Sequence, residues 1–137
     1  MNATRLPFVA VALVCATLGV YLAVSSRGEA RLGRASAALA AGRNAEVIAE
    51  LEGLRGEAGS RAHALRGYAY RDTGRLEAAR TAFQAAARRD PNNWVLQREY
   101  AGVLLRLGLR AKARARMSRA KALNPRMPLP AGFADAK

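Results

Sequence analysis

The sequence has little that could support metal, disulfide or imidazole chemistry. Its 137 residues include one cysteine, Cys15, and one histidine, His63. A single cysteine excludes an intramolecular disulfide and a cysteine-based metal site, and a single histidine excludes catalysis by a pair of imidazoles. The sequence also contains no phosphate-binding loop, nucleophile elbow or recognisable acid/base pair. We therefore predict a protein that is not an enzyme and that needs no metal or cofactor.

Aromatic and acidic residues are also scarce. Three Phe, four Tyr and one Trp make up 6% of the chain, whereas hydrophobic residues make up 51%, and alanine supplies most of the rest. This composition favours closely packed helices over a β-sandwich. Only 10 acidic residues oppose 23 basic ones, which gives a formal net charge of +13. Such an excess is compatible with acidic protein segments, anionic lipid or nucleic acid as partners.

Charged residues are absent between positions 6 and 26. Sixteen of the 19 residues from Leu6 to Val24 are apolar, and as a helix this run would span roughly 28 Å, close to the thickness of a bilayer core. It predicts a transmembrane anchor over residues 1–26 and a single-pass inner-membrane protein. A cleaved signal peptide is the alternative, although its apolar core is usually only about 7–15 residues long. The flanking arginines do not decide on which side the remaining chain lies.

The rest of the sequence repeats itself. Residues 60–91 align with residues 94–125 at an offset of 34, and each segment reads as helix, glycine turn, helix and closing proline. Residues 28–59 align less regularly, at an offset of 32. One such hairpin cannot bury its own apolar face, so about three must stack. The sequence therefore predicts an all-α protein, with the transmembrane helix followed by a short α-solenoid of about three helix-turn-helix repeats.

These repeats set the predicted domain boundaries. The repeat domain covers residues 27–127, divided into a degenerate repeat at 28–59 and two regular ones at 60–93 and 94–127. Asn93 is a suitable N-cap for the helix that opens the last repeat. Residues 128–137 are rich in proline and are expected to form an irregular tail.

The recurring positions match a known pattern. In residues 60–93, the pattern W-x2-L-G-x2-Y, A-x3-F and P meets His63, Arg66, Gly67, Tyr70, Ala79, Phe83 and Pro91, and five of the seven match. The chain therefore resembles the tetratricopeptide repeat family, and its layout looks like that of small membrane-anchored bacterial proteins of this family. The resemblance implies a repeat core at Gly67, Tyr70, Ala79, Phe83, Ala86, Pro91, Ala101, Leu104, Ala113, Met117, Ala120 and Pro125.

The resemblance also implies a binding groove. In this family the first helix of each hairpin usually lines a concave groove that accepts an extended segment or a helix of a partner. The arginines at these positions would favour carboxylates, because Arg pairs with them bidentately. The expected function is thus a membrane-tethered adaptor that holds a protein partner, with acidic segments as candidates, near the bilayer and without a small-molecule substrate. The groove would consist of Arg61, Ala64, Tyr68, Arg71, Val95, Arg98 and Leu105.

Positive charge accumulates toward the C-terminal repeat. Residues 94–127 carry nine basic residues and one acidic residue, a net charge of +8, against +4 for residues 60–91 and −1 for residues 28–59. Part of this charge is a basic patch on one side of the last predicted helix. The patch is either a solvated face or the working part of a basic protein that binds a membrane surface or, less expectedly, nucleic acid. It comprises Lys112, Arg116 and Arg119.

Overall fold

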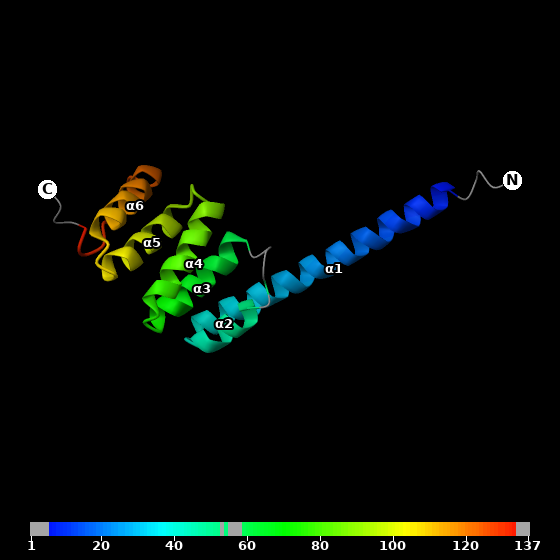
Figure 1. Cartoon of the computed structure of the whole chain (residues 1–137), viewed down its shortest axis with the longest axis horizontal. Helices are drawn as coiled ribbons and strands as arrows, with labels where there is room; N and C mark the ends of the chain where they lie inside the picture. The colour runs from blue at the N-terminus through cyan, green and yellow to red at the C-terminus, as the bar shows by residue number, and fades with distance from the viewer. Residues whose placement is uncertain (1–5, 53, 55–58, 134–137) are drawn as a thin grey trace.

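The computed structural model describes residues 6–52, 54 and 59–133, except for the side chains of residues 6–14 and 24. Within these residues the chain forms a row of α-helices in which each helix packs on the next along the sequence, from α1 on α2 to α5 on α6 (Figure 1). The contact between α2 and α3 and that between α4 and α5 join the hairpins. The fold is therefore a short α-solenoid. The helices are α1 (Leu6–Ala40), α2 (Asn44–Glu52), α3 (Ser60–Asp72), α4 (Leu76–Arg89), α5 (Trp94–Arg106) and α6 (Arg110–Leu123).

The turns inside the three hairpins have the same geometry. Gly42, Gly74 and Gly108 adopt positive φ values of 71°, 75° and 76°, a conformation that glycine reaches without the steric penalty of a Cβ atom. In each turn the amide after the glycine donates to the carbonyl five residues earlier, the bond that closes a Schellman motif. These bonds join Arg43 to Ala38, Arg75 to Tyr70 and Leu109 to Leu104, with N···O distances of 2.8, 2.8 and 2.9 Å.

Helix α1 departs from the prediction. It is one helix of 35 residues, so the apolar segment and the first helix of the first hairpin are continuous. Among the described residues we find no helix that combines the length and the apolar character that a membrane span requires, and Arg27, Glu29 and Arg31 lie within α1 after its apolar part. The predicted transmembrane anchor, the fold class that included it and the single-pass membrane location are therefore wrong. Residues 6–14 of the predicted apolar run have side chains outside the described part.

A single large ring organises the centre of the array. The side chain of Phe83 in α4 is 0% exposed, and a Cβ atom added to Gly67 in α3 would lie only 2.9 Å from three carbon atoms of this ring. The ring of Tyr68 meets Phe83 edge-on, with centroids 5.2 Å apart. Glycine at position 67 therefore allows α3 and α4 to approach until the backbone of one helix touches the ring of the other.

Most of the predicted repeat-core residues are buried, but three are not. Tyr70 is half-buried, and Pro91 and Pro125 are exposed. The two prolines therefore do not belong to the core. Each follows the end of a helix, where a residue without an N–H group and with a fixed φ stops helix propagation. The buried members, besides Gly67 and Phe83, are Ala79, Ala86, Ala101, Leu104, Ala113, Met117 and Ala120.

The segment after α6 folds back on the last hairpin. Met127 is 1% exposed, and its carbonyl accepts a hydrogen bond of 2.7 Å from Lys121 Nζ. Phe133 packs against the buried residues of α5 and α6. Gly132, at a φ of 87°, lies so close to Leu105 that a Cβ atom would come within 2.9 Å of its Cδ2 atom. The described part of the tail thus covers one face of the α5–α6 hairpin.

Candidate binding surfaces

The predicted groove residues lie on α3 and α5, on a surface that we call the α3–α5 face. Its centre is the carboxylate of Glu99, which is 15% exposed. Arg71 of α3 donates from Nη1 to Glu99 Oε2 at 2.6 Å, and Arg98 of α5 donates from Nη2 to Glu99 Oε1 at 2.6 Å. Both hydrogen bonds are charge-assisted; the one from Arg71 joins two hairpins, whereas the one from Arg98 lies within α5.

Aromatic rings support both guanidinium groups. Arg71 lies over the ring of Tyr68 at 5.1 Å from its centroid, and Arg98 lies over the ring of Trp94 at 5.2 Å, which are favourable cation–π distances. Burial, and secondarily the charge of Glu99, raises the pKa of the Tyr68 phenol. The hydroxyl of Tyr68 therefore stays protonated at neutral pH and can donate a hydrogen bond.

The charges at the centre of this face balance. Arg71 also pairs with Asp72 at 2.8 Å, so Arg71 and Arg98 are opposed by two carboxylates. The reasoning from sequence missed Glu99. A detectable signal existed, because the position 34 residues earlier holds Leu65, which is 8% exposed, and a carboxylate at a position that packs between hairpins requires a cationic partner.

The remaining predicted groove residues differ in accessibility. Arg61 is exposed, and Val95 and Leu105 are half-buried. Ala64 is 8% exposed and packs with Ala86 and Leu96 between the two hairpins, so it is a contact between repeats rather than an available surface residue. Leu105 lies beside the tail at Gly132.

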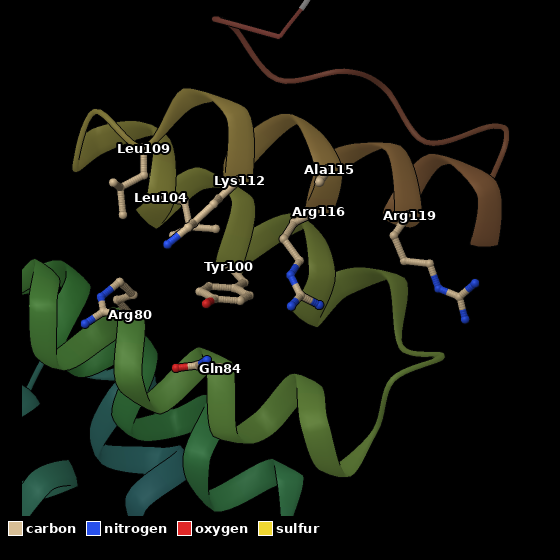
Figure 2. A pocket seen from close by; sticks show the side chains of 9 residues that line it. All are labelled: Arg80, Gln84, Tyr100, Leu104, Leu109, Lys112, Ala115, Arg116 and Arg119. Carbon is tan, nitrogen blue, oxygen red and sulfur yellow. The ribbon is translucent and has the colours of Figure 1, made fainter.

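The second candidate surface is a cavity of about 480 Å³ between α4 and α6, which we call the α4–α6 groove. All three residues of the predicted basic patch line it from α6, and Arg80 lines it from α4 (Figure 2). Helix α5 contributes the floor, in which Tyr100 and Leu104 are 5% and 1% exposed. The groove is lined by Arg80, Gln84, Tyr100, Leu104, Leu109, Lys112, Ala115, Arg116 and Arg119.

The basic-patch residues have only neutral partners within the described part of the chain. Arg116 lies over the ring of Tyr100 at 5.1 Å from its centroid and donates to Gln97 Oε1 at 3.3 Å. Arg119 donates to Asn92 Oδ1 at 2.9 Å. No described carboxylate lies within ion-pair distance of either arginine or of Lys112. In the α4–α6 groove Arg80 is paired with Glu77 at 2.6 Å, whereas the charge of the three α6 cations is thus not balanced by a described carboxylate.

Comparison with known families identifies the central hairpin. Residues 60–93, which contain α3 and α4, match the family model described as tetratricopeptide repeat. The chain contains a tetratricopeptide repeat. Repeats of this family generally mediate protein–protein interaction and are typically not enzymes. A search of curated proteins gave no match to the sequence. Across the described residues no three potential metal-ligating side chains cluster.

Within the tetratricopeptide repeat, His63 stands at the position that the family usually gives to Trp. It lines a cavity together with Glu52, Arg66 and Tyr70. Burial is the main cause that lowers the pKa of His63, and the charges of Arg66 and Arg89 lower it further. The environment of this side chain therefore favours the neutral imidazole, as expected for a packing residue.

The stability of the protein is accordingly expected to fall as the pH drops below about 6.5, the ordinary pKa of histidine. Below that value His63 is protonated in the unfolded chain, whereas the folded chain binds this proton only at a lower pH. Protonation therefore favours the unfolded state, and the stability falls until the pH passes the folded-state pKa of His63. Urea denaturation at pH 7.5 and pH 5.0 measures the change. Because carboxylates also titrate, the informative quantity is the difference between the wild type and His63→Gln, which should lose less stability on acidification. An identical loss in both proteins would contradict this assignment.

Proposed function

We propose that the protein is a non-enzymatic interaction module whose α3–α5 face binds a peptide or helix of a protein partner. The observation that carries this proposal is the network around Glu99, which fixes Arg71 and Arg98 over Tyr68 and Trp94. Tyr, Trp and Arg are the residue types that dominate binding energy at protein interfaces. Side chains that are already held in place lose little conformational entropy when a partner docks.

The balanced charge of this face also limits which kind of partner segment it can attract. Because Arg71 and Arg98 are already opposed by Glu99 and Asp72, an acidic segment would gain little from them by Coulomb attraction. We therefore propose a segment that places an apolar side chain against Tyr68 and Val95, and that offers backbone carbonyls or hydroxyl groups to the guanidinium N–H donors.

Photocrosslinking tests this proposal in cells. A benzophenone side chain at Arg61, and separately at Val95, should capture the same discrete protein partner, since the two positions correspond one repeat apart. The same probe at Ser118, an exposed residue of α6, is the matched control and should not capture it. Tyr68→Ala should weaken binding of the captured partner by about 30-fold, as loss of a hot-spot residue does. Capture of that partner only from Ser118, or unchanged binding by Tyr68→Ala, would refute the proposal.

A further inference from the structure

The basic side chains of the α4–α6 groove are not a requirement of the repeat. One repeat earlier, an equivalent cavity is lined by residues of α2, α3 and α4. At an offset of 34, the places of Lys112, Arg116 and Arg119 are taken there by Ala78, Ala82 and Ala85. Alanine therefore satisfies the packing at all three positions. The cations of the later groove need another explanation.

The position of the three cations along α6 suggests an elongated ligand. Lys112, Arg116 and Arg119 are spaced as i, i+4 and i+7, so they share one face of the helix and extend over about 10 Å of its length. Figure 2 shows their side chains leaving α6 in a row, without converging on one point. A single phosphate group would require converging donors. A row of this length fits a series of separate negative charges.

The apolar residues of the groove limit the class of ligand that can bind there. Tyr100 and Leu104 close its base but are only 5% and 1% exposed. The apolar surface that the groove offers is therefore that of Leu109, which is 36% exposed, and of the exposed Ala115. Single-stranded nucleic acid is held mainly by bases that stack on open aromatic faces, but the ring of Tyr100 is 5% exposed and already carries Arg116. An amphipathic helix, by contrast, can place apolar side chains against Leu109 and Ala115 and carboxylates against the row of cations.

We propose that the α4–α6 groove binds an acidic amphipathic helix of a protein partner. Carboxylates spaced i, i+4 and i+7 on that helix pair with Lys112, Arg116 and Arg119. The arginines exchange only the neutral partners Gln97 and Asn92 for these carboxylates, so no ion pair is broken on binding. This site is separate from the α3–α5 face, and either site can be correct without the other.

The probe is a fluorescein-labelled synthetic helix with glutamates at i, i+4 and i+7 and leucines on the adjoining face. Its binding to the full chain is measured by fluorescence anisotropy at about 0.15 M salt, where surface charges are screened beyond roughly 8 Å. The triple variant Lys112→Ala, Arg116→Ala and Arg119→Ala restores the residues of the equivalent helix α4, so its fold should persist. Three lost charge pairs should weaken binding by about tenfold or more. Replacing the glutamates of the probe with glutamines should cause the same loss.

The matched control removes the same charge elsewhere. Arg106, Arg110 and Arg114 are exposed and line a different cavity near the tail, and their replacement by alanine should change binding by no more than about threefold, the effect of net charge alone. An equal loss in both triple variants would overturn the proposal in favour of nonspecific attraction. Equally tight binding of the glutamine probe and the glutamate probe would overturn it as well.

Two further measurements separate the acidic helix from other anions. The double variant Arg116→Glu and Arg119→Glu should bind a probe with lysines in place of the glutamates, and should no longer bind the original probe. If a single-stranded oligonucleotide or a vesicle of anionic lipid binds the wild type more tightly than the acidic helix, and the groove variant alone loses this binding, the groove belongs to that ligand and the proposal is wrong.

Discussion

Replacing Phe83 with alanine should lower the free energy of unfolding by about 3–5 kcal/mol, the usual cost of removing a buried aromatic ring from a packed core. The ring is 0% exposed and touches α3 at both Gly67 and Tyr68. Collapse of the surrounding helices could fill little of the void, because the neighbours on α3 and α4 are mostly alanine and glycine. Since small domains have only about 5–15 kcal/mol of stability, the variant should lose a large share of its stability.

Urea denaturation followed by circular dichroism measures this loss. Leu129→Ala is the control, because Leu129 is 44% exposed and its truncation should change stability by only about 0.5 kcal/mol. Neighbouring repeats stabilise each other through their interfaces, so the loss should spread beyond α3 and α4. Equal stability of Phe83→Ala and the wild type would mean that this ring does not organise the core.

Gly67→Ala should destabilise the protein by about 1–3 kcal/mol, the cost of inserting a methyl group into a filled core. The added Cβ atom would lie 2.9 Å from three atoms of the Phe83 ring, which is too close for undisturbed packing. Gly102→Ala provides a matched control with the opposite expected sign. Gly102 also lies inside a helix but has no atom within 4 Å of an added Cβ, so the change should stabilise α5 by about 0.5–1 kcal/mol.

A double-mutant cycle ties the cost of Gly67→Ala to the ring. Phe83→Leu shortens the side chain that the new methyl group meets, so the double variant should be less destabilised than the sum of the two single variants by about 1 kcal/mol. Strict additivity would show that the penalty of Gly67→Ala arises from another contact.

Local signals in the sequence predicted the hairpins well. Gly74 and Gly108 recur at the turn positions, and the structure gives both the positive φ that glycine favours. The predicted N-cap at Asn93 is confirmed, since its Oδ1 accepts from the amides of Val95 and Leu96 at 3.1 and 3.4 Å. The resemblance to the tetratricopeptide repeat is confirmed for residues 60–93. These features depend on neighbours in the sequence, and sequence patterns report them directly.

Other features depend on distant residues and were missed. The pairing of Arg71 with Glu99 spans 28 positions, and it changes the α3–α5 face from a cationic surface to a balanced one. Helix α1 was misjudged for a different reason. Ser25, Ser26 and Gly28 are residue types that often cap or end a helix, but α1 runs through them without a break. Apolar character alone did not reveal where the helix ends.

Because α1 is continuous, the number of residues within it determines how the hairpins are oriented relative to its first half. A helix advances about 1.5 Å and turns about 100° with every residue. One residue inserted between Ser26 and Arg27 would therefore swing the three hairpins, with both candidate binding surfaces, by more than a quarter of a revolution relative to the first half of α1. An insertion of 7 or 11 residues would bring the azimuth back to within about 20°, and one of 18 residues, about five complete turns, would restore it. The rotational orientation of the hairpins about the axis of α1 is thus determined by the length of this one helix.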